Sequence, residues 1–293
     1  MTRQRMVAGV VIVGALAHAA ALAAGTPVPD AEPPCLTRAA AALNAGDNKK
    51  ALEAARPGCD KGVAACCGAA SAASYRLKDY ADAAALGAQG CKAGDVTACV
   101  YGAAAFQNLK KHEEAARLGA AGCDLGGAPA CGTAAAALNN LKKHAEAAAI
   151  GLRGCDGRDG FSCAYAADAF IELGQIEKSA EAGEKGCAIG NGASCASAGA
   201  AYVELKRLDK ALDLSARGCD AGDALACAGA AAVYLSGNNN AKAAAYGSKG
   251  CDKGSATACR AAAAAYQKLK NRARSAEMYL RCCTLGDLEC CKK

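Results

Sequence analysis

Cysteine is the residue type that offers this chain the most chemistry. The sequence has 20 cysteines among 293 residues, and most of them form eight pairs whose members stand eight positions apart. Zinc sites favour C-x2-C type pairs brought together in fours, whereas a seven-residue gap separates the members of each regular pair here, so the spacing favours disulfides. The first members are Cys59, Cys91, Cys123, Cys155, Cys187, Cys219, Cys251 and Cys283, and the second are Cys67, Cys99, Cys131, Cys163, Cys195, Cys227, Cys259 and Cys291.

Four further cysteines stand outside this pattern: Cys35, Cys66, Cys282 and Cys290. Pairing Cys35 with Cys66 and Cys282 with Cys290 would use all twenty, although crossed pairing within the C-terminal cluster fits the spacing equally well. Extra bridges near both ends would cap terminal units. A redox switch at a vicinal pair is the alternative use.

Other catalytic or metal-binding patterns are missing from the sequence. His112 and His144 take the same place in two neighbouring units, where we expect solvated bend residues too far apart to share a metal ion. The sequence holds no S-x-x-K, S-D-N, K-T-G or G-x-S-x-G motif of serine enzymes, and its glycines form no phosphate-binding loop. We therefore predict no catalytic residue, no cofactor and no metal site.

The N-terminus indicates export. Arg3 and Arg5 precede an apolar run over residues 6–23 that ends in small residues, a pattern typical of a signal peptide spanning 1–24. A retained membrane anchor is the alternative. Residues 25–34 form a short Pro-rich segment. Export to the periplasm or the outside would place the cysteines in an oxidising space, where disulfides persist.

The cysteine pairs recur every 32 residues, as from Cys59 to Cys91, without an insertion. Such a period predicts an all-α, right-handed α/α solenoid of helix-turn-helix repeats over residues 35–293, with about seven and a half helical pairs. A glycine three residues after the first cysteine suits a helix C-terminus, and a capping residue such as Asp95 follows. Each pair of cysteines would thus close the turn between one repeat and the next.

Disulfides have a physical purpose in this chain. Its hydrophobic content is 53%, but most of this is alanine, with three Phe and no Trp. Alanine buries little apolar area, so a core made of it is thin. Closing an eight-residue loop contributes about 2.5 kcal/mol in the loop-entropy model, and eight such bridges would offset the thin core.

The turn sequence GCDLGGAPAC at Gly122 to Cys131 resembles Sel-one-like repeats, and more closely their disulfide-rich branch, the cysteine-rich Helicobacter proteins. The spacing from aromatic residue to small residue within a unit is similar to that of tetratricopeptide repeats. The resemblance implies an α/α superhelix with each pair bonded within its own turn. It also implies either binding of partner proteins or a penicillin-binding or β-lactamase-type hydrolase.

Two surfaces are candidates for binding. The tetratricopeptide-like alignment places a peptide groove on the first helix of each repeat, walled by Ala72, Ala104, Ala136, Asp168, Ala200, Ala232 and Ala264. The peptide-binding residues it predicts are Gln107, Asn108, Asn139, Asn140, Asp168, Glu172, Glu204 and Lys268. The bends carry a basic ridge, which we expect to be a solvated edge, made of Lys78, Lys110, Lys111, Lys142, Lys143, Lys206, Arg207, Lys270 and Arg272.

The sequence therefore favours an exported, disulfide-stapled scaffold for a protein or peptide partner. The hydrolase is the first alternative, with cell-wall material or a β-lactam as its ligand, and a purely structural envelope protein is the second. The net charge of +6 falls to +4 without Arg3 and Arg5. This balance is too mild to predict nucleic acid or a membrane as a partner.

Overall fold

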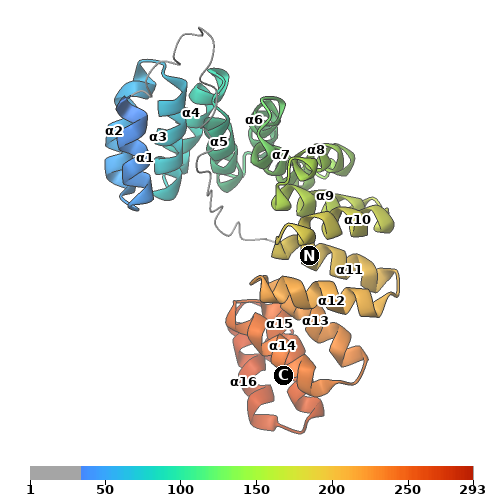
Figure 1. The fold of residues 1–293 in the computed structure, drawn as a ribbon. Coiled ribbons are helices and arrows are strands. Elements are labelled where there is room, and N and C mark those ends of the chain that lie inside the picture. Colours follow the sequence, from blue (N-terminus) through green and yellow to red (C-terminus); the bar gives the residue numbers. More distant parts are fainter. Residues whose placement is uncertain (1–33, 293) are drawn as a thin grey trace, which may run out of the picture. The chain divides into compact units, whose positions relative to one another are not determined.

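The computed structural model describes residues 34–292, and this part of the chain is all-helical (Figure 1). The predicted signal peptide over 1–24 and the Pro-rich segment up to residue 33 lie outside the described residues. None of the described helices is long and apolar enough to cross a membrane. The helices are α1 (Pro34–Asn44), α2 (Asn48–Asp60), α3 (Ala64–Arg76), α4 (Tyr80–Lys92), α5 (Val96–Asn108), α6 (His112–Asp124), α7 (Ala128–Asn140), α8 (His144–Asp156), α9 (Gly160–Glu172), α10 (Ile176–Ala188), α11 (Gly192–Glu204), α12 (Leu208–Asp220), α13 (Ala224–Ser236), α14 (Asn240–Asp252), α15 (Ala256–Lys268) and α16 (Arg272–Thr284), followed by the 3-10 turn η1 (Cys290–Lys292).

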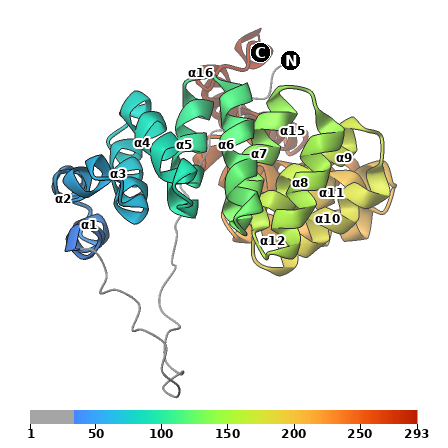
Figure 2. The ribbon, with the colours of Figure 1, turned by 90° about the horizontal axis from the view of Figure 1, so that it is seen from above.

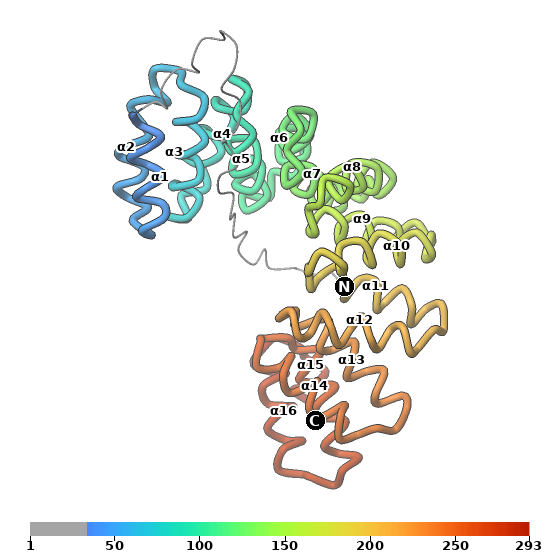
Figure 3. Tube along the Cα trace, viewed as in Figure 1, coloured from blue at the N-terminus to red at the C-terminus, as the bar shows by residue number. Residues whose placement is uncertain are grey.

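These helices confirm the predicted solenoid and make eight complete pairs over the described residues, rather than the expected seven and a half. The odd-numbered helices form one layer and the even-numbered helices the other (Figures 1 and 3). Each odd helix packs against the next odd helix, whereas successive even helices make only a few contacts. The odd helices are therefore the tightly packed layer, and Figure 2 shows the same order of helices from above.

Helices begin at intervals that are half as long as the 32-residue sequence repeat. Helices α2 to α16 all have 13 residues, and three residues separate each helix from the next, so helices begin every 16 residues, as at Asn48, Ala64 and Tyr80. Both kinds of bend are the same Schellman turn. After α2, Val63 N donates to Gly58 O at 3.0 Å, and after α5, Lys111 N donates to Phe106 O at 2.9 Å.

The middle residue of every bend has a positive φ, which favours glycine. Glycines fill this place in six of the seven bends between repeats and in the bend after α16, but Arg158, with a φ of 63°, fills the remaining one. Within the repeats the residue is usually a lysine, such as Lys110 at 59°. Five residues of the predicted basic ridge thus define the bends themselves: Lys78, Lys110, Lys142, Lys206 and Lys270.

Helix caps follow the predicted bends. Asp95 is the N-cap of α5 and accepts a hydrogen bond from Ala98 N, and Asp159, Asn191, Asp223 and Ser255 act in the same way for α9, α11, α13 and α15. Burial raises the pKa of the Asp95 and Asp159 carboxyl groups, while hydrogen bonds to Ala98 and Ser162 oppose this rise. These caps supply partners for amide groups at the helix starts.

Disulfides close each bend between repeats, as the fold prediction requires. Cys59 is bonded to Cys67 with a Cα–Cα distance of 4.4 Å, and the other regular pairs have the same connectivity. At the ends, Cys35 is bonded to Cys66 and Cys282 to Cys290, so the C-terminal pairs are not crossed. The bridges fix one helix end onto the start of the next helix.

The glycine before a regular cysteine permits this close approach. A Cβ atom at Gly90 would lie 2.6 Å from the Ala98 Cβ and 2.7 Å from the Cys67 Cβ, distances that real Cβ atoms do not show. A small residue also recurs at one place in the even helices, and Ala51, Ala115 and Ser179 at this place are fully buried. Small side chains therefore set the helix spacing across the solenoid.

A ladder of ion pairs accompanies the cysteine turns, and the sequence analysis missed it. In each of these pairs the cation stands two positions before the first cysteine of its repeat, as Arg153 does before Cys155. Its acidic partner directly follows the first cysteine of the repeat before, as Asp124 follows Cys123. Arg153 contacts Asp124 at 2.9 Å and Lys249 contacts Asp220 at 2.7 Å. Lys185–Asp156 and Arg281–Asp252 are equivalent. These side chains are largely exposed, so each pair adds little stability.

The left-handed bend at Arg158 provides a first prediction. Arg158→Gly should raise the free energy of unfolding by about 1 kcal/mol, because a glycine adopts this backbone conformation without the Cβ clash. Gly126→Ala at the equivalent bend is the matched control. A Cβ at Gly126 would meet nothing within 4 Å, so a loss of about 1 kcal/mol there would come from the backbone alone. Chemical denaturation measures both, and a destabilised Arg158→Gly would contradict the account.

A second prediction concerns the staples. Replacing Cys123 and Cys131 together by alanine should lower the free energy of unfolding by about 2.5 kcal/mol, because the unfolded chain then regains the freedom that the loop removes. Thermal unfolding of the oxidised protein measures this, with the reduced wild type as the limit in which all bridges are absent. Equal melting temperatures of oxidised and reduced protein would show that alanine packing alone holds the helices.

Candidate functional site

The odd-helix face is the surface on which the predicted groove lies. In α9, Phe161, Tyr165, Asp168 and Glu172 follow one another at intervals that place them on one side of the helix. We define the odd-helix face by these four places in α5, α7, α9, α11, α13 and α15. Of the eight predicted peptide-binding residues, Gln107 and Asn139 lie one position to the side of the face, and the others belong to it.

Gln107 and Asn139 join successive repeats. Gln107 Nε2 in α5 donates to Thr133 O in α7 at 2.7 Å, and Asn139 Nδ2 in α7 donates to Tyr165 O in α9 at 3.0 Å. The two residues are 32 positions apart, so this is one bond repeated at successive repeats. Their amide donors are engaged inside the solenoid and hold the odd helices together.

Two more of the predicted residues are also engaged. Asn108 Nδ2 donates to Ala104 O at 2.9 Å and lies 3.3 Å from the Tyr75 hydroxyl oxygen. Asp168 is half-buried and accepts a hydrogen bond from Ser197 Oγ at 2.8 Å, which joins α9 to α11. These side chains shape the face more than they reach out from it.

The remaining predicted residues are exposed at the ends of odd helices. Asn140, Glu172, Glu204 and Lys268 lie at the C-terminal ends of α7, α9, α11 and α15. Glu172 and Glu204 have no ion pair among the described residues. They give the middle of the face two carboxylates in successive repeats.

The predicted alanine wall changes along the chain. Ala72 and Ala136 are buried, with 3% and 7% of their surface exposed, whereas Ala200 and Ala232 are exposed. In the first repeats the tyrosines of α3 and α5 pack together, since the Tyr101 ring centre lies 5.6 Å from that of Tyr75. Burial raises the pKa of Tyr75, which keeps its hydroxyl protonated. The open part of the face is therefore the stretch over α9, α11 and α13.

Exposed apolar side chains border this open stretch. Phe161 is 37% exposed, Leu225 is 40% exposed and Val203 is 43% exposed. The sequence analysis missed them, although Phe161 and Leu225 stand where other repeats have the smaller Thr97, Pro129 or Ala193, which is a visible signal. Small alanines, apolar borders and two carboxylates together suit an extended peptide with apolar and basic side chains.

An open cavity of about 510 Å³ lies elsewhere, between α6 and α8 on the even-helix side. Leu138, Leu141 and Ile150 line it together with charged residues such as Arg117. Leu138 stands at the place that a phenylalanine takes in the repeat before, at Phe106, and the repeat after, at Phe170, so a smaller side chain accounts for the space. Among its lining residues, Lys143 belongs to the basic ridge, and none belongs to the predicted peptide groove.

The histidines are less solvated than predicted. His112 and His144 are the first residues of α6 and α8, and both are half-buried. His144 Nδ1 lies 3.3 Å from Asn139 Oδ1, and His112 Nδ1 is buried without a hydrogen-bond partner. Both rings are therefore partly shielded from solvent at the start of their helices.

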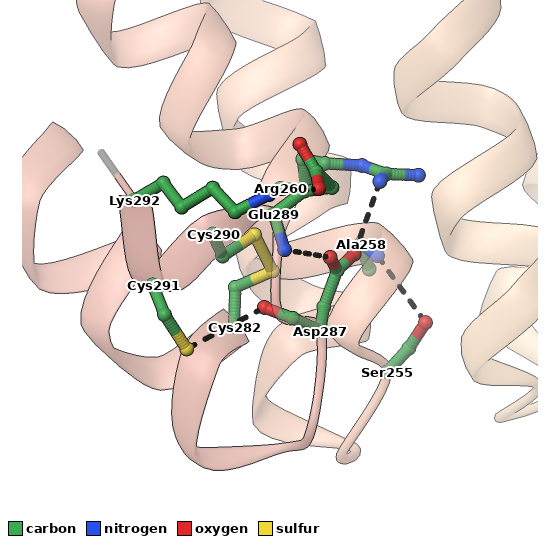
Figure 4. A network of polar contacts seen from close by, with 9 residues as sticks. All are labelled: Ser255, Ala258, Arg260, Cys282, Asp287, Glu289, Cys290, Cys291 and Lys292. Carbon is green, nitrogen blue, oxygen red and sulfur yellow. Dashed lines mark hydrogen bonds and ion pairs between the residues drawn. A yellow bond between two sulfur atoms is a disulfide. The ribbon is translucent and has the colours of Figure 1, made fainter.

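Cys282, Asp287 and Cys290 place their potential ligand atoms within 4.8 Å of one another (Figure 4). The two sulfur atoms are bonded to each other in a disulfide. Metal coordination by cysteine uses the thiolate, so the oxidised cluster serves as a cap rather than as a ligand set.

Several buried serines have structural partners, although the buried Ser179 Oγ has none among the described residues. Ser71 Oγ donates to Ala83 O at 2.8 Å, and Ser275 Oγ donates to Ala263 O at 3.0 Å. Ser162 and Ser194 donate to backbone carbonyl groups of the preceding odd helix, at Ala128 and Gly160. These hydroxyl groups link neighbouring helices.

No family model and no curated protein matches the chain. Among solved structures, the chain is similar to one described as the APC/C hetero-tetramer Cut9-Hcn1, with a TM-score of 0.57, 15% identity and coverage of 78% of this chain. The match spans 48% of that structure's chain, about half its length. YrrB, described as a TPR protein with an unusual peptide-binding site, has a TM-score of 0.40 and 18% identity, and the match covers 54% of this chain and 85% of the YrrB chain. MamA has a TM-score of 0.41 and 14% identity, and the match covers 52% of this chain and 94% of the MamA chain. The likeness to the first of these structures supports the fold alone, a helical repeat solenoid.

The bonds between repeats lead to a third prediction. Replacing Gln107 and Asn139 together by alanine should lower the free energy of unfolding by about 1 to 2 kcal/mol, since two half-buried carbonyl groups lose their donors. Asn140→Ala is the control next to Asn139 and should change stability by less than about 0.5 kcal/mol. Urea denaturation measures the three variants. Equal stability of the double variant and the wild type would show that these two hydrogen bonds do not stabilise the fold. The two amides would then again be candidates for binding a ligand.

Proposed function

We propose that this chain is an exported, disulfide-stapled scaffold whose odd-helix face binds a partner protein through an extended segment with apolar and basic side chains. The open stretch over α9, α11 and α13 carries the proposal. It combines exposed Ala200 and Ala232 with apolar borders and the carboxylates of Glu172 and Glu204.

The fold supports a scaffold for protein–protein interaction, because equivalent positions in stacked repeats form a continuous surface. Extended peptides bind such surfaces through their backbone and through pockets for alternate side chains. Carboxylates without a cationic partner favour a basic segment and disfavour an acidic one.

Export is the second part of the proposal. Twenty cysteines, all of them bonded in the described residues, are compatible with an oxidising compartment, since thiols stay reduced in most cytosols. The N-terminal pattern over residues 1–24 adds a sequence-based reason. The envelope of a bacterium is the compartment that we propose.

A peptide library tests the proposed face. Peptides selected from a random library on the oxidised protein should be enriched in basic and apolar residues. For a selected peptide, Ala200→Trp and Ala232→Trp should each weaken binding by about tenfold or more, because the indole ring would occupy the open stretch of the odd-helix face. Fluorescence anisotropy with a labelled peptide measures the dissociation constants.

Ala241→Trp, at an exposed alanine in α14, is the matched control and should leave the dissociation constant within about twofold. Circular dichroism of each variant verifies the fold. If the selected peptides bind Ala200→Trp and Ala232→Trp as tightly as the wild type, the peptide-binding site lies away from the odd-helix face.

A further inference from the structure

The positive charge of the chain is concentrated in its last repeat. Residues 260–293 contain eight Lys and Arg against three Asp and Glu, a net charge of +5, while the whole chain has a net charge of +6. The rest of the solenoid is close to neutral. A mild overall charge therefore conceals a strongly basic C-terminal end.

Two of the three acidic groups in residues 260–293 have cationic partners, and the third, Glu277, is exposed in α16. Asp287 contacts Arg260 at 3.0 Å and Glu289 contacts Lys292 at 2.7 Å (Figure 4). Asp252, in α14, contacts Arg281 at 2.8 Å. Four exposed cations have no ion pair among the described residues, and we name them the basic cluster: Lys268, Lys270, Arg272 and Arg274.

The basic cluster departs from a pattern that most even helices follow. Helices α4, α6, α8, α10 and α12 each carry Asp or Glu in the first turn, where the helix dipole favours negative charge. Helices α2, α14 and α16 have no acid there, and α16 carries Arg272 and Arg274. Cations at this end of a helix oppose the helix dipole, and together with the net charge of the last repeat they favour an external anionic partner.

Apolar side chains are exposed on the same repeat. Leu280 is 66% exposed and Leu288 is 73% exposed, and Leu269, at 45%, lies between two lysines of the basic cluster. Ala276 is exposed in α16, whereas its equivalents Ala84, Ala116, Ala148, Ala180 and Ala244 are buried in earlier repeats. Leu269 thus lies beside cations that have no ion pair among the described residues, and Leu280 and Leu288 lie farther along the same repeat.

We infer that the last repeat, α15 and α16, docks the protein onto a negatively charged lipid surface. Such a surface offers phosphate groups to the basic cluster and an apolar boundary to Leu269, Leu280 and Leu288. A soluble polyanion would use the cations alone. The disulfides Cys282–Cys290 and Cys283–Cys291 hold the end of α16 in place beside the leucines. This surface is separate from the odd-helix stretch over α9 to α13.

Vesicle co-sedimentation tests the inference. The oxidised protein should bind vesicles that contain phosphatidylglycerol, bind vesicles of pure phosphatidylcholine weakly, and lose affinity as salt rises. Changing the four residues of the basic cluster to glutamine should weaken binding by about tenfold or more, since each cation near an anionic surface contributes attraction. Leu280→Ser with Leu288→Ser should weaken binding at the same salt concentration.

The matched control removes four positive charges elsewhere, by changing Lys110, Lys111, Lys142 and Lys143 to glutamine. It should bind vesicles like the wild type, and an equal loss would overturn the inference by showing a general charge effect. Inorganic polyphosphate is the competing probe. If the leucine variant binds vesicles normally and polyphosphate binds the basic cluster more tightly than vesicles do, the site is a polyanion site and the lipid assignment is wrong.

The Ala200→Trp variant separates this inference from the proposed function. It should retain vesicle binding while losing the selected peptide, because the two surfaces lie on different repeats. Circular dichroism and thermal unfolding of every variant ensure that lost binding does not reflect lost structure.

Discussion

Every bend of the solenoid depends on one residue held in the left-handed backbone conformation. Because this residue recurs every 16 positions, from Gly46 to Gly286, each helix has the same length and each bend the same hydrogen bonds. Equivalent side chains then lie in register from repeat to repeat. The disulfides, the Arg153–Asp124 type of ion pair and the Gln107 type of amide bond are all consequences of that register.

Close helix approach and crosslinking act together in this protein. Glycines such as Gly90 let a helix end touch the next helix start, and this contact brings two cysteines into bonding distance. The same small residues bury little apolar area, so hydrophobic stabilisation per repeat is low. Disulfides reduce the freedom of the unfolded chain and offset part of that shortfall. The disulfides therefore compensate in part for the low apolar burial that comes with small residues.

Regularity also makes departures from the pattern informative. Leu138 in an aromatic place accounts for the cavity between α6 and α8. Phe161 and Leu225 add exposed apolar surface to the open stretch of the odd-helix face. Arg272 and Arg274 reverse the charge of a helix first turn. The proposed peptide surface and the inferred lipid surface both rest on such departures, and they lie in different parts of the chain.

The sequence by itself determined the periodic features. Glycine, cysteine and capping residues act on their immediate neighbours, so the spacing of Cys123 and Cys131 was enough to predict two helices and the bridge between them. The tertiary structure decided which polar groups face other repeats. Asn139 and Asn140 are adjacent in sequence, yet Asn139 donates to a carbonyl group in the next odd helix and Asn140 is exposed. Likewise Ala72 and Ala200 are equivalent by period, but only Ala200 is exposed, because the side chains of neighbouring helices differ. Burial and bonding between repeats depend on distances across the stack, and a one-dimensional period does not contain them.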